Sequence, residues 1–167
     1  MKPIRYVLLA AFLIMSVMSA LVYTSCHKDK CVDVACKNLG SCYDGNCTCL
    51  PGYEGSRCDT LSRHKFIYTW NGADSCTAGL RAGIYQYPLY FYAIPAKPLE
   101  MQMKHFLNNW DDSATCTMQA TDSFTFSGNN NSTVYRGTGK LYHDTLKLVC
   151  HVDIDTVHFD CKWIGGR

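Results

Sequence analysis

The feature that most constrains this chain is its cysteines, of which there are 11 in 167 residues. Such a density is typical of proteins that fold in an oxidising compartment. Six cysteines crowd into residues 31–58, a span too short to bury a hydrophobic core, so disulfide bonds must hold it together. The six are Cys31, Cys36, Cys42, Cys47, Cys49 and Cys58, and the others are Cys26, Cys76, Cys116, Cys150 and Cys161. Spacing alone leaves the pairing open.

The chain begins with the pattern of an export signal. Lys2 and Arg5 precede an uncharged, apolar run over residues 6–23. This run ends in Thr24-Ser25-Cys26, which resembles the lipobox of bacterial lipoproteins. The resemblance implies that residues 1–25 are a signal peptide and that Cys26 carries a lipid anchor. An uncleaved signal anchor is the alternative.

The end of the crowded block carries a second resemblance. Residues 47–58 read C-T-C-L-P-G-Y-E-G-S-R-C and resemble the C-terminal half of an EGF-like domain. Gly52 and Gly55 suit the tight turns of that half, because glycine adopts positive φ without steric cost. The resemblance implies a domain over residues 31–59 with the pairs Cys31–Cys42, Cys36–Cys47 and Cys49–Cys58.

The rest of the chain, residues 64–167 after a short linker at 60–63, is predicted to be all-β. Runs of aromatic and β-branched residues alternate with Gly, Asn, Asp and Pro, and no run has the apolar period of a helix. The predicted strands cover residues 66–70, 83–87, 89–94, 101–107, 115–120, 123–127, 133–141, 145–152 and 157–163. Close turn signals favour an antiparallel meander that forms a small barrel or half-barrel.

This second module resembles the β-rich, lipocalin-like domains that follow an EGF-like repeat in Gram-negative lipoproteins. The resemblance rests on Gly72-Ala73-Asp74-Ser75-Cys76 and on the Gly137–Leu146 stretch before the final cysteine-bearing strand. It implies a disulfide between Cys76 and Cys161. Cys116–Cys150 is then left as the fifth pair.

Two groups of residues are candidate sites. His151 and His158 are expected nearly opposite each other on the exposed face of the last hairpin. They are weak candidates for zinc or copper ligands, with Asp153 or Asp160 as a third. A cluster of tyrosines, namely Tyr85, Tyr87, Tyr90 and Tyr92, is expected either to pack in the core or to form a surface for a ligand or partner.

Several classes of function are disfavoured. A net charge of +2 without a Lys/Arg run argues against nucleic-acid binding. One carboxylate between two lysines at residues 27–30 cannot supply the oxygen ligands that calcium needs. No hydrolase, metalloprotease or nucleotide-binding motif occurs, so we predict no enzyme and no cofactor.

These observations predict a lipid-anchored protein of the cell envelope. Residues 1–25 form the signal and 26–30 a lipidated tether, which attaches the chain to the outer membrane on its periplasmic or outer face. The EGF-like domain acts as a spacer, and the β domain binds an unknown protein or glycan without catalysis. The alternatives are a carrier of a small apolar ligand in a barrel cavity and a secreted or signal-anchored EGF-type factor.

Overall fold

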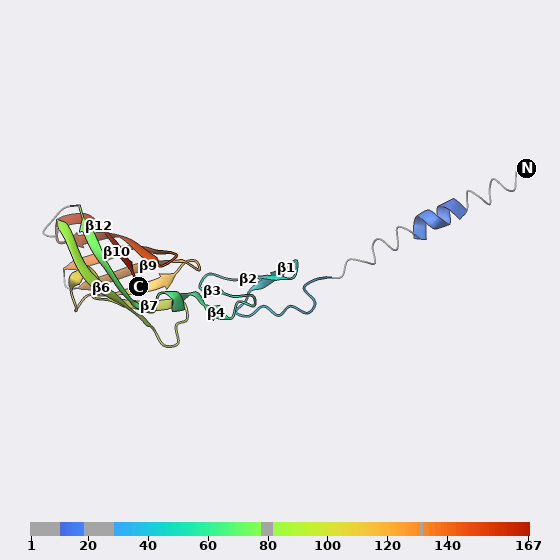
Figure 1. Ribbon diagram of the computed structural model, residues 1–167, viewed down its shortest axis with the longest axis horizontal. Coiled ribbons are helices and arrows are strands. Elements are labelled where there is room, and N and C mark those ends of the chain that lie inside the picture. Colours follow the sequence, from blue (N-terminus) through green and yellow to red (C-terminus); the bar gives the residue numbers. More distant parts are fainter. Residues whose placement is uncertain (1–10, 19–28, 78–81, 131) are drawn as a thin grey trace, which may run out of the picture.

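The computed structural model describes residues 11–18, 29–77, 82–130 and 132–167. Residues 11–18 form a short helix, and a disulfide-rich region and a β-barrel follow it along the chain (Figure 1). Within the described parts, no helix has the length and apolar character needed to cross a membrane. Cys26 and most of the expected signal sequence lie outside the described residues.

The disulfide-rich region contains two small hairpins. Strands β1 (Ser41–Tyr43) and β2 (Asn46–Thr48) pair across a two-residue turn at Asp44-Gly45, where both residues have positive φ. Strands β3 (Tyr53–Glu54) and β4 (Thr60–Leu61) form the second pair. The two-residue turn with a glycine is the type that matches the twist of a hairpin.

Disulfides provide the interior of this region. The three bonds are those that the EGF-like resemblance implies, Cys31–Cys42, Cys36–Cys47 and Cys49–Cys58. Cys58 is fully buried, whereas Val32, Leu39 and Tyr43 are largely exposed. Since the apolar side chains lie outside, the covalent bonds must stabilise the region in place of a hydrophobic core.

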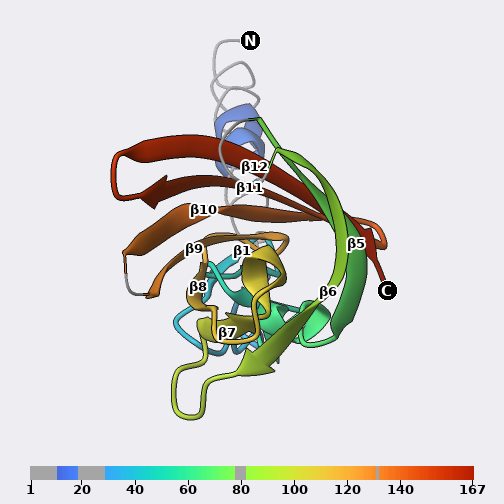
Figure 2. The same cartoon turned by 90° about the vertical axis from the view of Figure 1, so that its left-hand side faces the viewer.

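Eight antiparallel strands form a closed barrel. In chain order they are β5 (Thr69–Cys76), β6 (Gly83–Ala93), β7 (Glu100–Lys104), β8 (Ser113–Met118), β9 (Ser123–Asn130), β10 (Thr133–Tyr142), β11 (Thr145–Ile154) and β12 (Val157–Gly166). Each strand pairs with the next along the chain, and β12 pairs with β5 to close the barrel (Figure 2). The predicted meander is therefore an up-and-down barrel.

The strands differ from the sequence prediction chiefly at three places. The runs predicted at 83–87 and 89–94 form one strand, β6, and the first strand occupies Thr69–Cys76 rather than 66–70. The strand predicted at 101–107 ends at Lys104, and a 3-10 helix, η3 (Phe106–Asn108), follows it. Pro88 is tolerated inside β6 because β7 pairs with β6 only from Tyr90 onward. A proline in a strand needs one side without a hydrogen-bonding neighbour, and Pro88 has β5 as its only paired strand.

Large side chains fill the barrel. The largest that are fully buried include Trp70, Trp163, Tyr135, Phe66, Phe106, Phe124, Leu89, Met101, Met103, Leu146, Leu148 and Val152. The inward positions Gly137 and Gly139 on β10 make room for aromatic rings. A Cβ atom at Gly137 would lie 2.7 Å from Cζ of Phe126, and one at Gly139 would overlap the ring of Phe124. The interior thus alternates small and large residues, as small barrels do.

A buried arginine joins the disulfide-rich region to the barrel. Arg63 lies in a short 3-10 helix, η1 (Ser62–Lys65), directly after β4. Its Nη1 group donates to the carbonyl oxygens of Ile94 and Lys97 in the β6–β7 loop and of Glu100 at the start of β7. Gly52 packs against Leu99 of the same loop so closely that a Cβ atom would overlap that side chain. These contacts fix the disulfide-rich region against one end of the barrel.

The cysteine pairing of the barrel is confirmed for one pair and wrong for the other. Cys76 and Cys161 form the predicted disulfide between β5 and β12, but Cys116 and Cys150 are buried free thiols. Cys116 pairs with Phe126, Phe126 with Gly137, and Gly137 with Cys150. Two strands, β9 and β10, therefore lie between the two thiols. Three steps of about 4.8 Å from strand to strand place the cysteines about 14 Å apart along the sheet. A disulfide requires Cα atoms within about 7 Å.

We expect Cys116 and Cys150 to resist alkylation in the folded chain and to react fully once it is unfolded. Burial raises the pKa of the Cys150 thiol to about 12 and that of Cys116 well above its ordinary value, so few reactive thiolates form. Mass spectrometry after iodoacetamide treatment, with and without guanidinium chloride but without reductant, checks this. Peptides carrying a Cys116–Cys150 disulfide after unfolding would contradict the assignment.

We expect Arg63→Met to destabilise the protein by about 2–4 kcal/mol, because it removes charge-assisted hydrogen bonds from a buried guanidinium group to three partly buried carbonyl groups. Urea unfolding of the 167-residue chain measures the loss. Lys65→Met is the matched control, since the ion pair of Lys65 with Glu54 is partly exposed and its removal should cost less than about 1 kcal/mol. Equal losses for the two variants would show that Arg63 does not hold the loop.

Candidate functional site

The hairpin of β11 and β12 carries a polar cluster on its outer face. The two strands pair from Thr145↔Gly166 to Ile154↔Val157, so the turn consists of Asp155 and Thr156. The sequence alternates apolar and polar residues along both strands. The structure buries Leu146, Leu148, Cys150 and Val152 on β11 and Phe159, Cys161 and Trp163 on β12, whereas Val157, expected on the same inner face, is exposed beside the turn. Four polar residues project outward near the turn, namely His151, Asp153, His158 and Asp160, and we call them the His/Asp cluster.

The register of this hairpin differs from the prediction. The expected turn at 153–156 would place His151 beside His158, whereas in the structure His151 faces Asp160 and Asp153 faces His158. The prediction that the two histidines lie opposite each other is therefore wrong, and they are diagonal neighbours. Their rings are nearly parallel, with centroids 6.3 Å apart.

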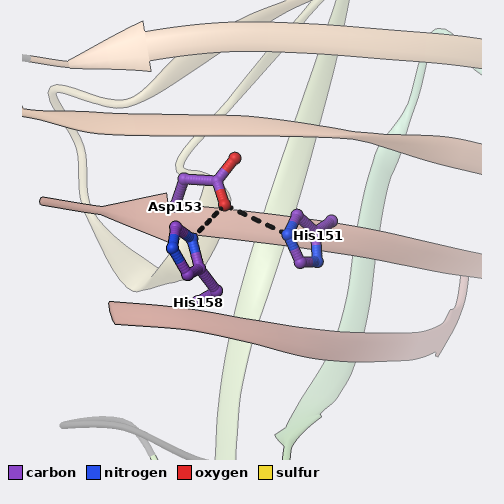
Figure 3. A group of neighbouring side chains, drawn as sticks. All are labelled: His151, Asp153 and His158. Carbon is purple, nitrogen blue, oxygen red and sulfur yellow. Dashed lines mark hydrogen bonds and ion pairs between the residues drawn. The ribbon is translucent and has the colours of Figure 1, made fainter. Parts of the chain in front are cut away.

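One carboxylate oxygen links both imidazoles. Oδ1 of Asp153 lies 3.0 Å from Nε2 of His151 and 2.6 Å from Nδ1 of His158 (Figure 3). The other ring nitrogen of His151, Nδ1, lies 2.8 Å from Oδ1 of Asp160. The second oxygen of Asp153 is 3.5 Å from Nη1 of Arg136 on β10. Ligand atoms of His151, Asp153 and His158 all lie within 4.8 Å of one another.

These contacts favour the charged form of Asp153. The hydrogen bond with His158 lowers the pKa of the Asp153 carboxyl, and the nearby positive charges of His151 and Arg136 lower it further. The cluster thus presents an ionised carboxylate between two imidazoles at neutral pH. Such a set of groups can bind protons or a metal ion.

The predicted tyrosine surface is only partly present. Tyr87 points into the barrel, where it is buried and donates its hydroxyl hydrogen to a carboxylate oxygen of Asp74. It therefore does not belong to an outer surface. Tyr85 and Tyr92 are exposed and Tyr90 is half-buried. Strand alternation separates Tyr90 and Tyr92, on the outer face of β6, from Tyr87 on the inner face. Tyr85 has the same parity as Tyr87 but lies near the start of β6, where it is exposed.

An exposed tryptophan, which the sequence analysis did not single out, completes an aromatic platform with Tyr90 and His105. The side chain of Trp110 is 67% exposed. Its ring stacks on His105 with centroids 3.9 Å apart and on Tyr90 at 5.4 Å. His105 is itself buried, and its Nδ1 lies 2.9 Å from the carbonyl oxygen of Pro88. The platform is thus anchored to β6.

The loop that presents Trp110 has an unusual backbone. His105, Leu107 and Asn108 all have positive φ, between 53° and 64°. L-residues adopt this region at a steric cost, and such strain persists where the surrounding structure enforces it. The Asn108-Asn109 pair before Trp110 is a sequence signal for this backbone conformation, because asparagine adopts positive φ more readily than most residues.

A groove lies on the same side of the barrel. It has a volume of about 540 Å³, is open to solvent, and is lined by residues of β5, β6 and β12 that include Asn71, Ala73, Gln86, Pro88 and Ile164. Pro88 and Tyr90 are successive outward positions of β6, so the groove runs toward the aromatic platform. Together they form a surface of amide groups and aromatic rings.

No protein-family model, curated protein or solved structure matches the chain. A barrel of this kind hosts many unrelated functions, so the fold alone does not decide among them. Function must therefore be inferred from the aromatic platform, the groove and the His/Asp cluster.

We expect His158→Gln to raise the pKa of Asp153 toward the ordinary value of an aspartate, because the variant removes the hydrogen bond that lowers it most. A lowered pKa in the folded state stabilises the fold above the pKa of the unfolded chain, and this contribution disappears as the pH falls through the folded-state value. Carbon-13 NMR of the carboxyl group measures the titration. His143→Gln, which alters an exposed histidine at another turn, should leave it unchanged. An Asp153 titration that His158→Gln does not move would contradict this assignment.

Proposed function

We propose that this protein is a non-catalytic binding module displayed from the bacterial cell envelope, with a glycan as its partner. In this proposal Cys26 carries the lipid anchor, and an EGF-like domain acts as a spacer. The outer face of the barrel binds the partner. The observation that carries the proposal is the aromatic platform beside a groove that contains the amide side chains of Asn71 and Gln86, on the outside of a filled barrel.

The disulfide-rich region suits the role of a spacer. Its three disulfides hold a short segment without a hydrophobic core, and Arg63 attaches it to the β6–β7 loop. A barrel that is fixed to such a segment does not swing relative to it. The spacer would therefore hold the binding face at a set distance from residue 31.

The chemistry of the outer surface favours a glycan. Sugars present apolar C–H faces and a rim of hydroxyl groups, which suit aromatic rings and amide side chains. Tyr90 and Trp110 offer stacked rings, and Asn71 and Gln86 offer amide donors and acceptors in the adjoining groove. A set of pre-positioned rings also loses little conformational entropy on binding.

The alternative of a carrier for an apolar ligand receives less support. A closed eight-stranded barrel is wide enough to hold one small ligand when its interior is empty. Here Trp70, Trp163 and Tyr135 are among the fully buried side chains that occupy the interior. A ligand of ordinary size would have to displace several of them, at about 3–5 kcal/mol for each aromatic side chain.

Tryptophan fluorescence can test for glycan binding, because Trp110 is exposed while Trp70 and Trp163 are buried. We expect at least one of cellohexaose, chitohexaose and a soluble peptidoglycan fragment to cause a saturable blue shift. We also expect that sugar to protect Trp110 from acrylamide quenching. Trp110→Ala should abolish the response, and Tyr142→Ala, which removes another exposed aromatic residue, should not.

The same protein sample also tests the alternative of a carrier for an apolar ligand. A fluorescent fatty acid that binds saturably at one site per chain, with no response to the sugars, would favour apolar transport and contradict the proposal. Saturable sugar binding that survives Trp110→Ala would show that the glycan binds elsewhere than the platform.

The anchor is tested by the intact mass of the protein purified from its native host. We expect a chain that begins at Cys26 and is heavier by a diacylglyceryl group and an acyl chain. Cys26→Ser should prevent processing and move the protein out of the outer-membrane fraction. A chain that retains residues 1–25, or an unmodified Cys26, would favour the signal-anchor or secreted alternatives.

A further inference from the structure

We propose that His151, Asp153 and His158 form a binding site for one divalent transition-metal ion, of which Zn²⁺ is the best match. The site lies on the outer face of the β11–β12 hairpin, apart from the aromatic platform. Two imidazoles and one carboxylate are a ligand set that zinc accepts readily in proteins. It is independent of the proposed glycan binding.

The three ligand atoms lie within 4.8 Å of one another, so side-chain rotations can bring them to one ion. Two ligand atoms on one tetrahedral zinc ion, each at about 2.1 Å, lie about 3.4 Å apart. Oδ1 of Asp153 is now 3.0 Å from Nε2 of His151 and 2.6 Å from Nδ1 of His158, so each distance must open by less than about 1 Å (Figure 3). The side chains of His151 and His158 are 39% and 60% exposed, which leaves room for small rotations.

The backbone already holds the three ligands in place. His151 and Asp153 are two residues apart on one face of β11, and His158 lies directly across from Asp153 on β12. Both strands belong to the closed barrel, so their separation is fixed before a metal arrives. Because the side chains alone need ordering, the entropic cost of binding is small.

Asp160 gives His151 the carboxylate partner that metal-binding histidines usually have. Its carboxylate lies 2.8 Å from Nδ1 of His151, the ring nitrogen on the far side from Asp153. Histidines that bind metals usually donate their other N–H to such a carboxylate, which fixes the tautomer and orients the ring. Asp160 is thus a positioning residue for His151.

The charges around the site also suit a cation. With neutral imidazoles, Asp153 and Asp160 are negative and Arg136 is positive. Arg136 contacts Oδ2 of Asp153 and leaves Oδ1 for the metal. Any proton on Nε2 of His151 or Nδ1 of His158 must leave before that nitrogen can bind a metal, so metal and protons compete. Three protein ligands leave a fourth position open to water or to a group on another molecule.

The test is a zinc titration of the 167-residue chain in detergent micelles, in a Cys26→Ser background that removes one competing thiol. Calorimetry follows binding of ZnCl₂ after treatment with a chelator, and NMR follows the ring protons of each histidine. We expect one zinc ion per chain, ring shifts confined to His151 and His158, and weaker binding as the pH falls. Zinc should also raise the melting temperature.

Four variants separate the roles of the residues. His158→Gln and Asp153→Asn each remove or weaken a ligand and should cause the largest losses of affinity. Asp160→Asn keeps all three ligands and should weaken binding by about 10- to 100-fold, the usual effect of losing an orienting carboxylate. His143→Gln changes an exposed histidine outside the cluster and should bind zinc like the parent. Circular dichroism of each variant verifies the fold.

The proposal would be overturned if the chain bound no zinc below millimolar concentration. It would also be overturned if His158→Gln and Asp153→Asn left zinc binding unchanged. Loss of affinity in His143→Gln equal to that in His158→Gln would also overturn it, since the ion would then sit elsewhere. An unaffected Asp160→Asn variant would remove Asp160 from the site and leave the three ligands.

Discussion

The pairing of the first and last strands of the barrel is the constraint on which the rest of the structure depends. β12 pairs with β5 from Cys161↔Cys76 to Gly166↔Asn71, and a disulfide joins the first of these pairs. The bonded cysteines are 85 residues apart, so the cross-link restricts the unfolded chain by about 4–5 kcal/mol in the chain-entropy view. Without closure, β5 and β12 would both be open edges beside a face of large apolar side chains.

Because large side chains fill the closed barrel, the groups that can bind a partner lie on its outer face. Two groups of outer side chains interact among themselves, the aromatic platform and the His/Asp cluster. Trp110 of the aromatic platform lies in the loop between β7 and β8, whereas the His/Asp cluster lies at the turn between β11 and β12. Because strands alternate in direction around the barrel, both connections lie at the end away from the β6–β7 loop, on different strands.

Local patterns predicted the parts of the fold that depend on sequence neighbours. The resemblance of residues 47–58 to an EGF-like domain implied the three disulfides of the N-terminal region, and the alternation of apolar and polar residues in β11 and β12 indicated their inner and outer faces. The predicted Cys116–Cys150 disulfide is wrong because its formation depends on which strands are neighbours. The prediction paired the two cysteines that remained after the other bonds were assigned, and that assignment says nothing about the strands that lie between them. The aromatic platform was missed because it depends on a strained loop that turns Trp110 back onto His105.

The length of the β11–β12 turn controls the arrangement of the His/Asp cluster. The sequence His151-x-Asp153 and His158-x-Asp160 places the same two residue types on each strand. With the two-residue turn, each histidine faces a carboxylate, and Asp153 lies between both imidazoles. The predicted longer turn would shift the pairing by two residues, place the histidines side by side and carry Asp153 into the turn. Such a slip preserves the inner and outer faces of both strands, so hydrophobic patterning alone does not select against it. The turn length therefore decides whether these four residues form isolated surface charges or a chelating group with an orienting carboxylate.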